Sequence, residues 1–262
     1  MRIRILISFW VIYLLTGCYG IMAPQPGTAP GDTLGISISF SATPDIFPRH
    51  WLKAPINANV QRLEREEEKR SKAAVVKALV KYPQQVIQNN LRAVYVLRSL
   101  NFYNVGFGAT YYENKLYLAN DGLLMGYSDL FIEQSFHHEF SSILYFNYKN
   151  DFNEGAWKQC NPPGFAYHDE ETGGVAALKN NEDGTDFASY YNTQGFIDQY
   201  AQSSLENDIN ELAQQLFSPD PGFWVMVDKY TPLRKKTRLL IGFYNKIDPA
   251  FTFEYFKNFD TR

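Results

Sequence analysis

The stretch from Asp129 to Tyr148 constrains the fold most, because it predicts an amphipathic helix that carries two adjacent histidines and a glutamate. Residues 137–142 of this stretch are His-His-Glu-Phe-Ser-Ser. Side chains four positions apart lie on the same face of a helix. His138 and Ser142 are therefore expected to share one face, and we expect that face to form the candidate site.

The segments before this helix predict a mixed domain of helices and strands. Strong helix formers occupy residues 59–82, and Pro83 ends that helix and begins a short helical turn. Residues 91–100 have the β-branched and aromatic content of a strand. Residues 105–119 predict a hairpin with its turn at 113–115.

The segments after it predict a loop-rich stretch and then helices. Residues 149–194 are rich in Pro, Gly and Asn, and a long stretch of this kind is often functional. We expect the basic cluster Arg234-Lys235-Lys236, with Arg238, to be the solvated start of a helix. The predicted helices span residues 206–217, 222–229, 233–246 and 250–258.

The first residues predict export from the cytoplasm. Arg2 and Arg4 precede an apolar run over residues 5–15, which is typical of a secretory signal peptide and too short to span a bilayer. The following Leu-Thr-Gly-Cys closely resembles the bacterial lipobox, which implies cleavage before Cys18 and acylation of that cysteine.

The predicted organisation therefore has three parts. Residues 1–17 are a lipoprotein signal peptide, and residues 18–57, rich in Gly, Pro, Ser and Thr, are a lipidated N-terminus and tether. Residues 58–262 are a single domain. With Cys18 acylated, Cys160 has no partner for an internal disulfide, and we expect it to be a partly buried structural thiol.

Composition narrows the function classes. Aromatic residues make up 16% of the chain, and most of them are expected to fill the core. The net charge is −3, so the chain lacks the basic surplus that nucleic-acid binding requires.

The motif on the predicted helix lacks one metal ligand. In the pattern His-Glu-x-x-His, the two histidines hold zinc and the glutamate acts on the metal-bound water. His138 and Glu139 occupy the first two positions, but Ser142 stands where the second histidine belongs. A neutral serine hydroxyl is a weak ligand for zinc.

Three stretches together resemble a Bacteroidetes group of zinc-binding metallopeptidases, the substrate-import-associated zinc metallohydrolase lipoproteins. These stretches are the lipobox, residues 136–140 and residues 195–201 leading into 206–211. The resemblance covers the chain from about residue 45 onward. It implies an α+β, zincin-like fold with a small mixed sheet, an active-site helix and a helical C-terminal part.

The resemblance also implies a set of ligands. In this family a later block usually reads Glu-Asp-Phe-Ala-Glu, and its first glutamate is the third ligand. Matched residue by residue, His138 is the first ligand and Glu139 the catalytic base. Ser142 and Asn207 occupy the second and third ligand positions, and Glu211 matches the closing glutamate. Two of three expected ligands are replaced, so we expect a lost or weakened zinc site and no cofactor.

Other residues offer an alternative metal site. His138 with His168 and either Glu206 or Glu211 would give three ligands of the types that zinc prefers. In the opposing interpretation, His137 and His138 are hydrogen-bonded to carboxylates such as Glu211 in a fold that has lost its metal.

The resemblance thus implies a membrane-anchored lipoprotein in the outer membrane of a Gram-negative bacterium, acting in the capture or import of a peptide or glycan. Two alternatives stay open. One is an active zinc metallopeptidase with the unorthodox ligands, and the other is a structural partner of an outer-membrane import complex. Whether the chain is an enzyme depends on the metal.

Overall fold

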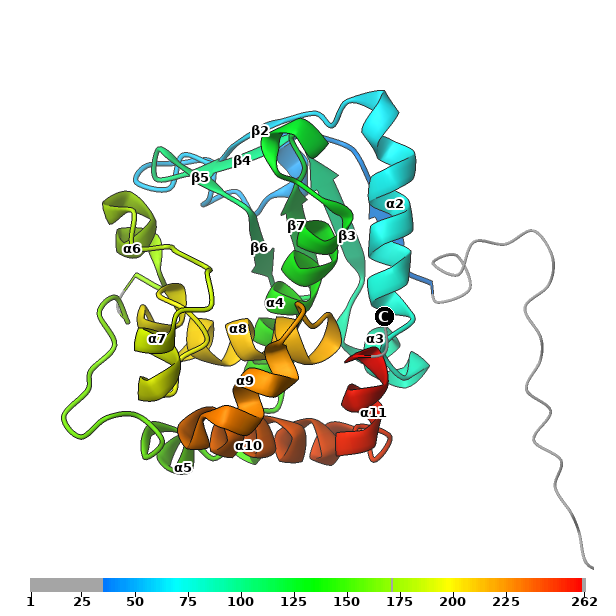
Figure 1. The fold of residues 1–262 in the computed structure, drawn as a ribbon. Coiled ribbons are helices and arrows are strands. Elements are labelled where there is room, and N and C mark those ends of the chain that lie inside the picture. Colours follow the sequence, from blue (N-terminus) through cyan, green and yellow to red (C-terminus); the bar gives the residue numbers. More distant parts are fainter. Residues whose placement is uncertain (1–34, 171, 261–262) are drawn as a thin grey trace, which may run out of the picture.

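A four-stranded mixed sheet occupies one half of the structure and a group of helices the other (Figure 1). The computed structural model describes residues 35–170 and 172–260. The predicted signal peptide and Cys18 lie outside these residues. The strand order is β1-β3-β7-β6, with bounds β1 Ser37–Ser39, β3 Ala93–Leu97, β7 Lys115–Ala119 and β6 Ala109–Tyr112. The first three strands are parallel, and β6 runs antiparallel to β7 at the edge.

The predicted hairpin forms, and it supplies this edge. Strands β6 and β7 pair with Tyr112 opposite Lys115, so Glu113 and Asn114 make the turn. Glu113 has a positive φ of 52°, a conformation that tight hairpin turns require. At the opposite edge of the sheet, β1 pairs with β3.

A second sheet corrects two predictions. It has the order β2-β4-β5, with bounds β2 Asn59–Gln61, β4 Ser99–Phe102 and β5 Val105–Phe107. Residues 59–61 pair with β4 instead of beginning the predicted helix, and the single strand predicted for residues 91–100 is divided between β3 and β4. Pairing with a distant strand overrides local helix propensity here.

The packing of the body also begins before residue 58. Ile36 is buried in the main core. Ile46 and Phe47 are buried in a smaller cluster under the second sheet, where the Phe47 and Tyr117 rings lie 5.0 Å apart. The segment predicted as a tether is therefore part of the fold from about residue 36 onward.

Helix α4 lies against one face of the four-stranded sheet, with α2 and α8 packed along it (Figure 1). Ser128 caps α4 by accepting a hydrogen bond from the Phe131 backbone N–H at 3.0 Å. Ser204 caps α8 in the same way. The helices are α2 Arg65–Leu79, α3 Gln84–Asn90, α4 Asp129–Asn147, α5 Glu154–Lys158, α6 Val175–Asn180, α7 Ser189–Gln194, α8 Leu205–Phe217, α9 Phe223–Lys229, α10 Thr231–Ile247 and α11 Phe253–Lys257.

Short 3-10 turns join several of these elements. They are η1 Pro44–Ile46, η2 Leu123–Met125, η3 Lys149–Asp151, η4 Tyr200–Gln202 and η5 Asn258–Asp260. The segment predicted to be loop-rich contains α5, α6 and α7. No helix within the described residues is long and apolar enough to cross a bilayer.

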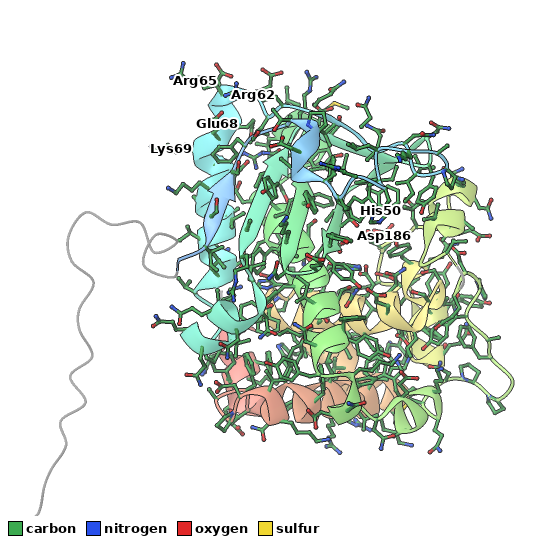
Figure 2. All side chains as sticks on the ribbon, turned by 180° about the vertical axis from the view of Figure 1, so that it is seen from behind. His50, Arg62, Arg65, Glu68, Lys69 and Asp186 are labelled. Atoms are coloured by element: carbon green, nitrogen blue, oxygen red, sulfur yellow. The ribbon has the colours of Figure 1, made fainter. Side chains whose placement is uncertain are left out.

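The charged residues at the start of α2 are exposed or half-buried. The side chains of Arg62, Arg65 and Lys69 point away from the sheet (Figure 2). The basic cluster on α10 behaves differently. Lys235 is exposed, but Lys236 is buried, with Nζ 2.7 Å from Oδ2 of Asp208. The expectation of a solvated cluster is therefore wrong for Lys236, because its position on α10 turns it into the core.

Candidate functional site

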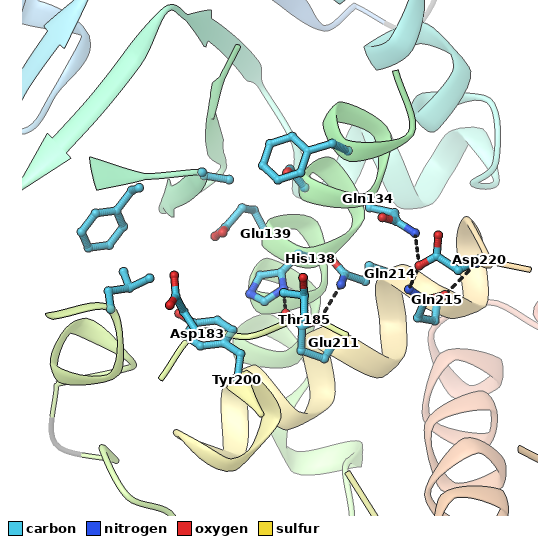
Figure 3. Close-up of a pocket in the computed structure, with 16 residues that line it drawn as sticks. Gln134, His138, Glu139, Asp183, Thr185, Tyr200, Glu211, Gln214, Gln215 and Asp220 are labelled. Atoms are coloured by element: carbon cyan, nitrogen blue, oxygen red, sulfur yellow. Dashed lines mark hydrogen bonds and ion pairs between the residues drawn. The ribbon is translucent and has the colours of Figure 1, made fainter. Parts of the chain in front are cut away.

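A pocket of about 230 Å³ lies beside the middle of α4, between the start of β6, α8 and the segment around Asp183 (Figure 3). His138, Glu139 and Glu211 all point into it. The pocket is lined by Phe107, Gly108, Ala109, Phe131, Gln134, Ser135, His138, Glu139, Leu178, Asp183, Thr185, Tyr200, Glu211, Gln214, Gln215 and Asp220.

His138 is held by α8 from the opposite wall. Its Nδ1 lies 3.2 Å from Oε1 of Glu211, and the His138 side chain is 12% exposed. This is the carboxylate contact that the sequence predicted for a fold without metal. The Tyr200 ring lies roughly parallel to the imidazole, with centroids 6.3 Å apart. Both neighbours restrict the orientation of the His138 ring.

Glu211 belongs to a pair of buried carboxyl groups. Burial raises the pKa of Glu211 to about 7, and a hydrogen bond with Asp198 acts in the opposite direction. Burial, and then the charge of Glu211, raise the pKa of Asp198 well above its usual range. Burial and the neighbouring carboxylate therefore both favour the protonated form of Asp198. The sequence analysis did not single out Asp198 as a site residue.

The carboxyl group of Glu139 has a pKa close to neutral pH. Its pKa is raised to about 7, mainly by burial and in part by the charges of Glu206 and Glu211, while the charge of His138 acts in the opposite direction. A carboxyl group with such a pKa can both accept and donate a proton near neutrality.

The side chain of Ser142, at the second-ligand position, is hydrogen-bonded to other residues. Its Oγ accepts a hydrogen bond from Nδ2 of Asn210 at 2.7 Å, and its side chain is buried. It is also hydrogen-bonded to the Tyr111 phenol, whose pKa is raised by burial and then by Glu206. Ser142 does not line the pocket.

Asn207, at the third-ligand position, is directed elsewhere. Its Nδ2 donates to Oγ of Ser203 at 2.8 Å and lies 3.4 Å from the Gly173 carbonyl oxygen. The neighbouring Glu206 is hydrogen-bonded to Tyr111. Neither Asn207 nor Glu206 lines the pocket.

His168 is not brought to the site either. It is exposed and packs beside Phe165, with ring centroids 5.8 Å apart, and it is not among the pocket residues. Of the alternative ligands that the sequence offered, only Glu211 lies next to His138.

The donor set can be compared with what catalytic zinc requires, which is three ligands and an open position. The pocket contains one imidazole, that of His138, whose Nδ1 already contacts Glu211. The carboxyl groups of Glu139 and Glu211 both have raised pKa values. Among residues 35–170 and 172–260, no group of three or more His, Cys, Asp or Glu side chains is arranged to hold a metal ion. As they stand, these residues do not fit a three-ligand zinc centre.

His137 faces away from the pocket and has a structural role. Its Nδ1 lies 2.8 Å from the hydroxyl oxygen of Tyr82, and its Nε2 lies 3.9 Å from Oε1 of Glu133. Burial lowers the pKa of His137 to about 4, so the imidazole is neutral. Glu133 is paired with Lys77 at 2.6 Å and with Lys81.

Comparison with known proteins finds no matching family model, no matching curated protein and no matching solved structure.

Proposed function

We propose that this chain is a lipid-anchored binding protein of the cell envelope, which captures a peptide or glycan for import in the pocket beside His138. Its scaffold is zincin-like, and its zinc site has been lost. One observation carries the proposal: both degenerate ligand positions are committed to other partners, Ser142 to Asn210 and Asn207 to Ser203.

Three features support the zincin-like scaffold. Helix α4 packs against the sheet beside the antiparallel edge strand β6, it carries the His138-Glu139 pair, and α8 brings Glu211 to the same histidine. This is the arrangement of sheet, helix and later helix that the resemblance implies.

The edge strand favours an extended peptide as the occupant of this pocket. Among residues 35–170 and 172–260, strand β6 pairs with β7 alone, so its outer edge has backbone groups that no strand in this part of the chain satisfies. Gly108 and Ala109, at the start of β6, line the pocket. An extended peptide can add to such an edge through main-chain hydrogen bonds while one of its side chains enters the pocket.

The metal part of the proposal is tested by elemental analysis. The purified lipoprotein, in detergent and dialysed against zinc chloride, is expected to retain far less than one zinc per chain. Restoring both positions, with Ser142→His and Asn207→Glu together, is expected to raise the zinc content. One zinc per wild-type chain that is lost in His138→Ala would overturn the loss of the site.

The binding part is tested with fluorescein-labelled casein peptides and fluorescence polarisation. We expect saturable binding that is weakened by Tyr200→Ala, because Tyr200 forms a wall of the pocket. Leu124→Ser is the control, because Leu124 is fully exposed and does not line the pocket. Equal binding by all three proteins would refute a peptide site here.

A second candidate is an active metallopeptidase, and one observation favours it. Glu139 has a pKa of about 7 and faces the same pocket as His138 and Glu211, which suits a general base. Zinc-dependent cleavage of casein that disappears in Glu139→Gln would establish this function in place of the binding protein.

A further inference from the structure

A second pocket, of about 610 Å³, lies where the β6–β7 turn meets the ends of α3 and α4. We propose that this pocket binds a neutral saccharide. Its lining is dominated by amides and aromatic rings, among them Asn89, Asn114, Asn147, Tyr111, Tyr112 and Phe146.

Phe146 provides an exposed apolar wall. It is 74% exposed at the end of α4, although the core beside it is rich in buried phenylalanines. Tyr112 is fixed on the other side by its edge-on contact with Trp51, whose ring centroid is 5.3 Å away. A pyranose ring presents a face of C–H groups, and such a face packs well on an aromatic ring that is already held in place.

The amides supply the complementary polar contacts. Within the described part of the chain, no hydrogen bond from the side chain of Asn89 or Asn114 to another residue is observed, so both are free to bind a ligand. Asn147 is oriented by donating from Nδ2 to Oδ1 of Asn90 at 2.9 Å. An amide offers both donors and an acceptor, and a sugar hydroxyl needs one of each.

Charge argues for a neutral ligand. Glu113 is the single charged residue that lines this pocket in the described chain, and no Lys, Arg or His is among the lining residues. A phosphate or a uronic acid would meet a carboxylate and no cation, which is unfavourable in a partly buried site. A neutral oligosaccharide needs no counter-charge.

The second pocket is separate from the first. The two have no lining residue in common, and they lie at opposite ends of β6: Ala109 lines the first, and Tyr111 and Tyr112 line the second. The saccharide site therefore does not rest on the function proposed for the pocket beside His138.

The test is isothermal titration calorimetry of the purified lipoprotein with maltohexaose, cellohexaose, xylohexaose and mannohexaose. We expect saturable binding of at least one of them. Phe146→Ala is expected to weaken that binding about tenfold by removing the stacking wall. Asn114→Ala is expected to weaken it about fivefold by removing one hydrogen-bonding amide.

Two controls make the result specific. Tyr190→Ala removes an aromatic side chain that is 69% exposed and lines neither pocket, and it is expected to leave saccharide binding unchanged. Tyr200→Ala, which alters the first pocket, should also leave it unchanged. No binding of any of the four hexasaccharides would overturn the proposal. So would binding that Phe146→Ala does not weaken, or loss of casein-peptide binding in Phe146→Ala with no saccharide bound.

Discussion

The ammonium nitrogen of Lys236 lies 2.7 Å from Oδ2 of Asp208, and both side chains are almost completely buried. The same oxygen accepts hydrogen bonds from Nε1 of Trp157 at 2.8 Å and from the Tyr167 hydroxyl at 2.7 Å. The Lys236 ammonium also lies 4.1 Å from the centre of the Phe196 ring. This cluster connects α10 with α8, with α5 through Trp157 and with the loop that contains Tyr167.

The first prediction concerns this buried pair. Burial raises the pKa of Asp208 and lowers that of Lys236, so each charge depends on the other. Lys236→Met leaves the carboxylate buried without a cation, and we expect a loss of about 3–5 kcal/mol in the free energy of unfolding. Urea denaturation followed by circular dichroism measures it.

Two further variants complete this test. Lys235→Met removes the neighbouring exposed charge and is expected to change stability by less than about 0.5 kcal/mol. Lys236→Met combined with Asp208→Asn should recover part of the loss, because no uncompensated charge then remains. Equal effects of Lys235→Met and Lys236→Met would contradict the role given to the pair.

A second prediction concerns pH. The pKa of His137 is lowered by burial to about 4, against about 6.5 in the unfolded chain, so between these values the unfolded state binds the proton first. The contribution of His137 to the free energy of unfolding is therefore complete above pH 6.5. It is lost as the pH falls towards 4, which costs on the order of 2–3 kcal/mol.

The test is the midpoint of urea unfolding between pH 7.5 and 4.5, in wild type and in His137→Gln. As the pH falls from 7.5 to 4.5, wild type should lose stability relative to His137→Gln, whatever the absolute stability of the variant. The raised pKa values of Glu139 and Glu211 add stability as the pH falls, but this contribution is common to both proteins. The lowered pKa of Glu133, held down by hydrogen bonds from its neighbours against the cost of burial, acts in a window below 4.5. His50→Gln alters an exposed histidine and should keep the wild-type slope. An unchanged slope in His137→Gln would disprove the assignment.

A third prediction concerns Ser142. Ser142→Ala leaves the Nδ2 donor of the buried Asn210 without its acceptor, so we expect a loss of about 1–3 kcal/mol in the free energy of unfolding. We expect no change in the zinc content of the protein. Ser141→Ala is the matched neighbour, because it removes a longer contact of 3.1 Å with the Tyr244 hydroxyl. A larger loss in Ser141→Ala than in Ser142→Ala would count against the prediction.

The last prediction uses two adjacent glycines. A Cβ at Gly174 would lie 2.5 Å from the Tyr200 hydroxyl oxygen and 2.6 Å from Nδ2 of Asn207, whereas a Cβ at Gly173 meets nothing within 4 Å. Both have positive φ, so both Gly→Ala variants carry backbone strain of about 1 kcal/mol. We expect only Gly174→Ala to displace Tyr200 and weaken binding of the labelled casein peptides. Equal binding by the two variants would show that Tyr200 does not shape the pocket.

Local signals made part of the fold predictable. The hairpin at β6 and β7, helix α4 and the later helices were found near their predicted places, because hydrophobic periodicity, turn residues and prolines act over a few residues. Residues 59–61 were misassigned, since their state depends on pairing with β4, some forty residues further along the chain. The contact between His138 and Glu211 was anticipated only because two motifs were matched to one family.

The sequence by itself determined which residue types stand on the site helix: a histidine and a glutamate in the positions of a zinc motif, and a serine in place of its second histidine. Only the tertiary structure decided what these residues contact. It turned Ser142 to Asn210 and Asn207 to Ser203, and it buried Lys236 against Asp208. Such partners come from helices far apart in the chain, and their choice follows from how α4, α8 and α10 pack together, which no local pattern encodes.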